Sequence, residues 1–215
     1  PDDIKSIHGL RFFAVFMIFI SHKSFFAYFY PMANRTRIIE ETFTGSTVLI
    51  RAGNLYTELF LMLSGLLASF SLTRKLEQKQ KINIFREYFD RYARIAPSLM
   101  VLIIISSFVM PYIGSGPLYK MLTEREAELC QQYWWRNLLF INVWFGIRPM
   151  CAFHSQHVSI DFELFLVAPL LVALIYKWPR RGTTCLLTLA IISSVAKSIV
   201  AYQKNLSEFI VHGLT

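Results

Sequence analysis

The amino-acid sequence predicts an all-α membrane protein, a multi-pass bundle of about five transmembrane helices with one re-entrant segment. Apolar residues make up 54% of the 215 residues and charged residues only 17%, against about 25% charged residues in soluble domains. Mean hydropathy is +0.43. The apolar residues also lie in long blocks, whereas helices of soluble domains show short amphipathic periods.

Five apolar blocks approach the length of about 20 residues that a bilayer-spanning helix needs. They lie at residues 10–30, 55–73, 95–113, 160–178 and 183–202. A sixth block, YWWRNLLFINVWF at 133–145, is too short to span comfortably. We expect a re-entrant or interfacial segment there.

The basic residues between the blocks predict the orientation of the chain in the membrane. The segment 74–94 is rich in Lys and Arg and should be cytoplasmic, because cytoplasmic loops carry an excess of these residues. Counting spans from it places 31–54, 114–159 and the C-terminal tail outside. It places 178–182 inside, which agrees with the two arginines of that segment.

The formal net charge of +8 is weak evidence for nucleic-acid binding, because membrane topology accounts for the clusters of basic residues. We therefore expect a lipid bilayer as partner and no nucleic acid. We expect no metal site and no cofactor. The chain begins at Pro1 rather than Met, and we expect residues 1–215 to be a partial transmembrane domain of a longer protein.

Several residues fit a location outside the cytosol. Asn34 and Asn205 each begin an N-glycosylation sequon on the predicted outer or luminal side. Cys130 and Cys151 share an outer loop, where oxidation is permitted. We predict a disulfide between them, with two unpaired thiols as the alternative. Cys185 lies in an apolar block and should pack there. These features fit a multi-pass protein of the endoplasmic reticulum or the plasma membrane.

Ionisable side chains inside a span are costly and are therefore candidates for function. His22 lies roughly 16 Å along the first helix from Arg11, at a rise of about 1.5 Å per residue. Arg11 is expected at the cytoplasmic mouth and His22 in the middle or outer half of the span. A structural histidine bonded to a neighbouring helix is the alternative for His22.

Three carboxylates, Glu58, Asp161 and Glu163, lie at the predicted outer ends of other spans. Asp161 and Glu163 are two residues apart and do not share a helix face, so only one should face the cavity of His22. A carboxylate beside an imidazole fixes its tautomer and raises its basicity, as a general base acting on a hydroxyl requires. A favourable charge at a helix N-terminus is the alternative.

Arg91 and Arg94 lie three residues apart, on one helix face at the predicted cytoplasmic start of the third span. Two guanidinium groups on one face suit a phosphate, and positive-inside anchoring is the alternative. With His22, they indicate a transferase that takes a phosphate-bearing donor from the cytosol, or a transporter for an anion.

Four motifs in order resemble those of the membrane acyltransferase family 3, particularly its animal "nose resistant to fluoxetine"-like branch of O-acyltransferase-like proteins. HGLRFFAVFMIFISH carries an R-x10-H motif as Arg11 and His22. ELFLMLSGLL resembles D-x-F-F-x-L-S-G-F, with Glu58 replacing Asp, and RYARIAPSL resembles R-x-x-R-x-x-P. SIDFELFLVAPLL resembles S-V-E-x-Q-F-Y-L-x-x-P-L-L, with Asp161 at the acidic position and Glu163 replacing Gln. CQQYWWRNLLFIN followed by a second Cys suggests the animal branch.

The resemblance implies acyl transfer from a cytosolic donor such as acyl-CoA, a co-substrate, to a hydroxyl on a small molecule, lipid or glycan. It implies the following roles: His22 as general base, helped by Asp161 or Glu58, and Arg11, Arg91, Arg94 and Glu163 as substrate-binding residues. The stretch HSQHVSID departs from the family pattern, and its two histidines are expected to be loop residues. The alternatives are a transporter or lipid-handling membrane protein without catalysis, and an inactive N-terminal-half fragment of the family's bundle.

Overall fold

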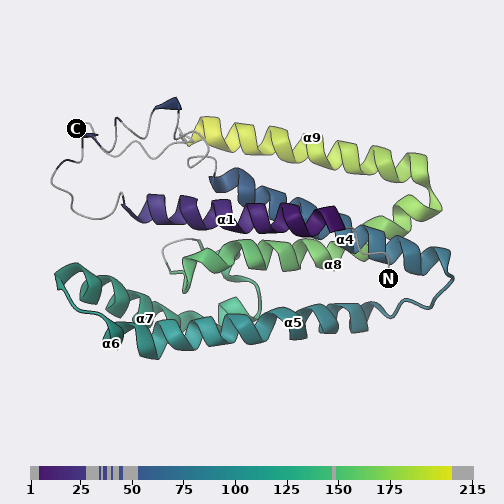
Figure 1. Cartoon of the computed structure of the whole chain (residues 1–215). Coiled ribbons are helices and arrows are strands. Elements are labelled where there is room, and N and C mark those ends of the chain that lie inside the picture. Colours follow the sequence, from purple (N-terminus) through teal and green to yellow (C-terminus); the bar gives the residue numbers. More distant parts are fainter. Residues whose placement is uncertain are drawn as a thin grey trace. The chain divides into compact units, whose positions relative to one another are not determined.

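The computed structural model describes residues 5–27, 34, 36–37, 40, 44–45, 53–146 and 149–204. Every regular element within these ranges is helical, which confirms the predicted all-α fold class (Figure 1). The chain divides into two compact units, Pro1–Ala168 and Pro169–Thr215.

Six long helices account for most of the described residues. They are α1 (Lys5–Ala27), α4 (Gly53–Glu77), α5 (Ile84–Ile104), α7 (Pro117–Leu138), α8 (Gln156–Lys177) and α9 (Pro179–Gln203). Short elements connect them: η2 (Ile105–Val109), a π-helix, α6 (Met110–Ile113), and the 3₁₀-helices η3 (Asn142–Phe145) and η4 (Phe153–Ser155).

Four stretches within the described ranges are long and apolar enough to cross a membrane. They are Leu55–Glu77, Ile84–Ile113, Phe153–Lys177 and Pro179–Gln203. Each contains or largely overlaps one of the apolar blocks predicted as spans. The remaining block, 10–30, extends beyond the described residues, and its described part forms α1.

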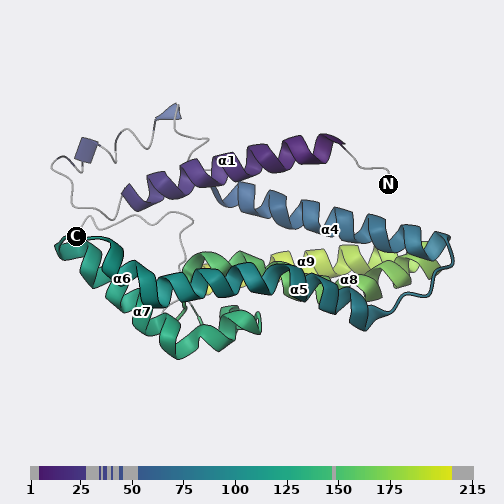
Figure 2. The same cartoon turned by 60° about the horizontal axis from the view of Figure 1, so that its bottom comes forward.

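In the first unit, α1 lies beside α4 (Figures 1 and 2). The Phe13 ring of α1 meets the Tyr56 ring of α4 edge to face, with centroids 6.1 Å apart. Ala14 is fully buried, and Phe12 on the same helix is exposed. An exposed phenylalanine is at no disadvantage in hydrocarbon, because lipid tails are as apolar as the side chain.

Helix α5 begins at Ile84, well before the apolar block at 95–113, so residues 84–94 are helical and the connecting turn lies within 78–83. The start is defined by Asn83, whose side-chain oxygen accepts a hydrogen bond from the Arg86 backbone N–H at 3.3 Å. Hydropathy identifies the apolar part of a helix but not the polar turns before it. Arg91 and Arg94 lie inside this helix, as their spacing on one helix face predicted.

The block at 133–145 spans two elements. Its first residues end α7, which begins at Pro117, and its last residues form η3. Pro at the first position of α7 suits a helix start. The apolar count at 133–145 missed the polar helix that precedes it.

The predicted disulfide Cys130–Cys151 is present and fully buried. It lies in a hydrophobic cluster formed by α5, α7, α8 and the loop after α7. In the same cluster, Phe140 stacks on Phe162 of α8, with centroids 4.4 Å apart. The cluster therefore attaches the loop to the start of α8.

In the second unit, a tight turn at Trp178 joins the end of α8 to α9. Gly182 is buried there, and a Cβ at this position would lie 2.8 Å from the Cα of Ile175. Only glycine allows the two backbones to approach so closely. Cys185, also on α9, is a free thiol.

Candidate active site

His22 is held in one tautomer by the backbone of its own helix. Its Nδ1 atom lies 2.9 Å from the carbonyl oxygen of Ile18, one turn earlier. A carbonyl oxygen only accepts, so Nδ1 carries the proton and donates it. In the neutral ring, Nε2 is then the acceptor, which is the form that a general base needs. Within the described ranges, no carboxylate is hydrogen-bonded to His22; the Ile18 carbonyl fixes the tautomer instead.

Two further histidines lie close to His22. His154, in η4, meets the His22 ring edge to face, with centroids 5.7 Å apart and an interplanar angle of 72°. His157, in the first turn of α8, lies where the charges of both His22 and Glu58 act on it. Its Nδ1 is buried and makes no hydrogen bond within the described part of the chain.

His154 lies in the short turn η4, within the connection as expected, whereas His157 lies in α8 rather than in a loop. They belong to the surroundings of the candidate base, together with Glu58. Their H-x-x-H spacing just before the acidic span was the only sequence signal for them. Within the residues that the structure describes, no group of three or more His, Cys, Asp or Glu side chains has an arrangement that would hold a metal ion.

The loop that carries His154 is held by buried amide groups. Asn137, at the end of α7, is 1% exposed. Its Nδ2 donates to the carbonyl oxygen of Cys151 at 2.7 Å and to Ser155 Oγ at 3.0 Å. Asn142 in η3 donates to the same Ser155 Oγ at 3.0 Å. These bonds enclose η4 on both sides, so the position of His154 depends on the end of α7.

Ala152, two residues before His154, adopts the left-handed conformation with φ 49°. Few residues without a polar side chain adopt this conformation unless their surroundings enforce it. Here the disulfide fixes the preceding residue, and the Ala152 N–H donates to Glu126 Oε1 at 2.7 Å. The turn leading to His154 is thus held by a covalent bond and by a charge-assisted hydrogen bond from α7.

A buried ion pair connects three helices of the first unit. Arg91 of α5 is only 9% exposed. Its Nη2 lies 2.5 Å from Asp161 Oδ2 of α8 and donates to Ser64 Oγ of α4 at 2.6 Å. The guanidinium carbon lies 4.2 Å from the ring centroid of Phe165. Asp161 is therefore the partner of Arg91, whereas the charge of Glu58 acts on His157.

The other predicted site residues are not among the charged partners of this ion pair. Arg94 is exposed, and Arg11 is partly buried. Glu163 Oε1 accepts a hydrogen bond from Trp144 Nε1 of η3 at 2.7 Å. Asn34 is exposed and accepts from the Arg37 N–H at 3.1 Å, whereas Asn205 lies outside the described residues.

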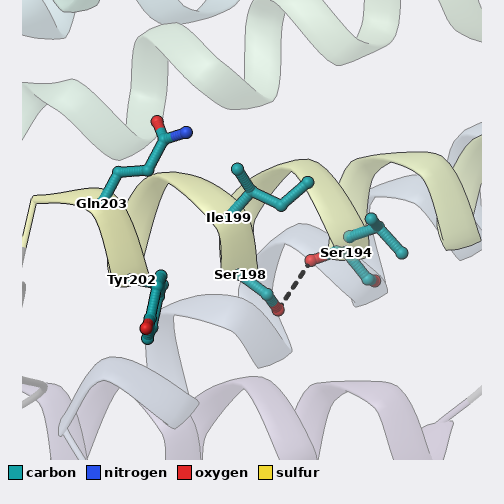
Figure 3. Close-up of a pocket in the computed structure, with 6 residues that line it drawn as sticks. Ser194, Ser198, Ile199, Tyr202 and Gln203 are labelled. Carbon is teal, nitrogen blue, oxygen red and sulfur yellow. Dashed lines mark hydrogen bonds between the residues drawn. The ribbon is translucent and has the colours of Figure 1, made fainter.

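A groove on α9 contains none of the predicted site residues (Figure 3). It is lined by Ser194, Val195, Ser198, Ile199, Tyr202 and Gln203. Ser198 Oγ donates to the Ser194 carbonyl oxygen at 2.9 Å, so this hydroxyl is occupied within its own helix. The groove has no acidic or basic side chain and supplies no chemistry for acyl transfer.

The fold and its candidate spans define the class: a multi-pass integral membrane protein of helices, with ionisable side chains gathered between them. The profile of the acyltransferase 3 family, described as an acyltransferase domain, matches residues 4–215. The chain belongs to this family of membrane acyltransferases.

Two curated relatives from Caenorhabditis elegans are similar to the chain. "Nose resistant to fluoxetine protein 6" is 27% identical over 219 residues, covering 92% of this chain and 26% of the relative. "Regulator of hypoxia-inducible factor 1" is 31% identical over 150 residues, covering 66% of this chain and 27% of the relative. The chain thus spans about a quarter of the length of these relatives. No solved structure matches it.

Proposed function

We propose that the protein containing this chain is a membrane O-acyltransferase in which His22 is the general base. One observation carries the proposal: Nδ1 of His22 donates to the Ile18 carbonyl oxygen, which leaves Nε2 as the proton acceptor. The family supports acyl transfer, and this tautomer supplies the group that acyl transfer to a hydroxyl needs.

In the proposed reaction, Nε2 of His22 removes the proton of the acceptor hydroxyl as its oxygen bonds to the acyl carbonyl carbon. The carbon–sulfur bond of a thioester donor then breaks, and the thiolate leaves with the bonding electrons. The thiolate takes the proton from the imidazolium, so His22 returns to its neutral form. The Ile18 carbonyl stabilises the imidazolium by keeping its hydrogen bond throughout.

The proposed donor carries phosphate groups, as acyl-CoA does, and the arginines divide into two roles. Arg94 is exposed on α5 and available to bind phosphate, and Arg11 is proposed to act with it. Arg91 already has an ion pair and a hydrogen bond. We therefore assign Arg91 mainly to holding α4, α5 and α8 together, and direct phosphate binding mainly to Arg94.

Acyl transfer by the full-length protein in membranes tests this function, with labelled acyl-CoA as the donor. His22→Ala should lower kcat by about 10²- to 10⁴-fold, the usual contribution of a positioned general base. The matched control is His8→Ala, which removes another histidine from the same helix and should leave kcat within twofold, roughly the scatter of a surface change. Unchanged turnover in His22→Ala would exclude His22 as the base. Ligand transport without acyl transfer would instead support the transporter alternative.

We also propose that Asn34 and Asn205 carry N-linked glycans on the outer side of the membrane. Digestion with a glycosidase, compared between the wild-type protein and Asn34→Gln or Asn205→Gln, tests each site separately. A glycan that is not removed by a glycosidase specific for high-mannose chains would indicate the plasma membrane. A glycan that this enzyme removes would indicate the endoplasmic reticulum. No shift in either digestion would remove both glycosylation assignments.

A further inference from the structure

His154 is a residue of the site for which the proposed chemistry has no role, although its ring lies against the His22 ring. The hydrogen bond to Ile18 comes from the same helix as His22, so it fixes the tautomer but does not fix the ring against other elements. Contact from a different element is needed for that, and His154 in η4 supplies it.

We propose that His154 is a positioning residue of the transferase site: its ring holds the His22 imidazole from the side, in the orientation in which Nδ1 donates to Ile18 and Nε2 is free for the acceptor hydroxyl. This inference rests on the proposed function, because it assigns His154 an effect through His22. It requires no proton transfer by His154 itself.

The ring geometry supports positioning. Edge-to-face pairs are a preferred arrangement of aromatic rings, with centroids about 4.5–7 Å apart, and the 5.7 Å and 72° of His22 and His154 fall in this class. The Phe153 ring also meets the His154 ring edge to face, with centroids 6.0 Å apart and an angle of 76°. The His154 ring therefore has two neighbouring rings, His22 and Phe153.

The rest of the loop supports positioning as well. The ring can orient His22 only if η4 itself is fixed, and η4 is held by three independent attachments. These are the Cys130–Cys151 disulfide, the bond from Ala152 to Glu126, and the two amides that converge on Ser155. So many buried polar contacts on one short turn suit an element whose exact placement matters.

The titratable groups around His22 and His154 come from three helices. His22 lies on α1, Glu58 on α4 and His157 at the start of α8, where the charges of Glu58 and His22 both act. His157 is thus a titratable neighbour of the pair, whereas His154 meets the His22 ring directly. Two variants of His154 can separate these roles, because phenylalanine keeps the ring and removes the proton.

The experiment measures kcat, KM and the pH dependence of acyl transfer by the full-length protein in membranes, for His154→Phe and His154→Ala. His154→Phe should retain kcat within about threefold and keep the wild-type pH profile. His154→Ala should lower kcat about tenfold or more at unchanged donor KM, because small displacements of a catalytic group are costly. His8→Phe is the matched control for introducing a phenylalanine in place of a histidine.

Equal loss of kcat in both variants would overturn the positioning role, as would full activity in His154→Ala. A changed pH profile in His154→Phe would also overturn it, since it would show that the titration of His154 matters. Failure of the proposed function is distinguishable: in that case His22→Ala itself keeps its turnover. If His154→Ala does not reach the membrane, two other variants test the positioning role. They are His154→Phe and the disulfide variant Cys130→Ala/Cys151→Ala. Positioning then predicts loss of kcat only in the latter.

Discussion

Replacing Asp161 with alanine should destabilise the folded protein by about 3–5 kcal/mol, because it leaves a buried guanidinium without its counter-charge. Arg91 is 9% exposed, and the two charges approach to 2.5 Å. At an effective dielectric constant of about 20, this separation corresponds to an attraction of about 6–7 kcal/mol. Desolvation of both groups offsets much of it, so the loss on deletion reflects the stranded Arg91 rather than the gross attraction.

Removing both charges should cost far less than removing Asp161 alone. In the double variant Arg91→Met/Asp161→Ala, no charge remains to be solvated, and the methionine side chain keeps apolar contact with Phe165. We expect this variant within about 1–2 kcal/mol of the wild-type protein, because an apolar pair often replaces a buried ion pair at little cost. The single variant Arg91→Met should lie between, since Asp161 is 24% exposed and keeps some solvation.

The measurement is the thermal unfolding of the solubilised full-length protein for the wild type, both single variants and the double variant. The four values form a double-mutant cycle, which isolates the interaction between the two side chains. Unfolding losses that simply add in the double variant would refute the idea that the ion pair couples α5 to α8. The donor KM of the double variant also tests Arg91. A KM close to that of the wild type supports a structural role, and a large increase supports phosphate binding.

Three further predictions follow from single positions. Asn137→Ala should cost about 1–3 kcal/mol of unfolding free energy, because it leaves the buried Cys151 carbonyl without its side-chain donor and Ser155 with Asn142 as its remaining amide donor; a wild-type melting temperature would contradict this. Gly182→Val should lower the melting temperature through a clash with the α8 backbone costing about 1–3 kcal/mol, whereas Gly65→Ala, where the space is open, should be tolerated. Arg94→Gln should raise the donor KM with a stability change within about 0.5 kcal/mol, and an unchanged KM would remove Arg94 from the donor site.

The membrane spans were predictable because their length depends on the bilayer and not on tertiary contacts. A block of about 20 apolar residues can satisfy its backbone only as a helix, so the positions at 55–73, 160–178 and 183–202 agree with the helices of the structure. The start of α5 was not predictable in the same way. Its first turns are polar, and the Asn83 cap is a local hydrogen bond that hydropathy does not register. The orientation of the spans in the membrane stays a prediction.

In the candidate site, the sequence predicted the residue types but not their partners. The R-x10-H motif identified His22. Its hydrogen-bond partner was expected to be a carboxylate, but in the structure it is the Ile18 carbonyl. A histidine on a helix can reach the backbone carbonyl one turn earlier. Either Asp161 or Glu58 was expected to assist His22, and the structure pairs Asp161 with Arg91. The residue types indicated acid–base chemistry, but did not show which charges meet.

By itself, the sequence determined that this is a helical membrane protein of the acyltransferase 3 family, which residues interrupt its spans, and that Cys130 and Cys151 are a candidate pair. The length of the apolar blocks and the order of the motifs can be read from the sequence without knowledge of tertiary contacts. Only the tertiary structure decided that His154 lies against His22 and that Arg91 pairs with Asp161. Such contacts depend on where a loop folds back. Here the loop is directed by the disulfide, by Glu126, which lies 26 residues before its partner Ala152, and by buried amides whose partners lie up to 18 residues away in the chain.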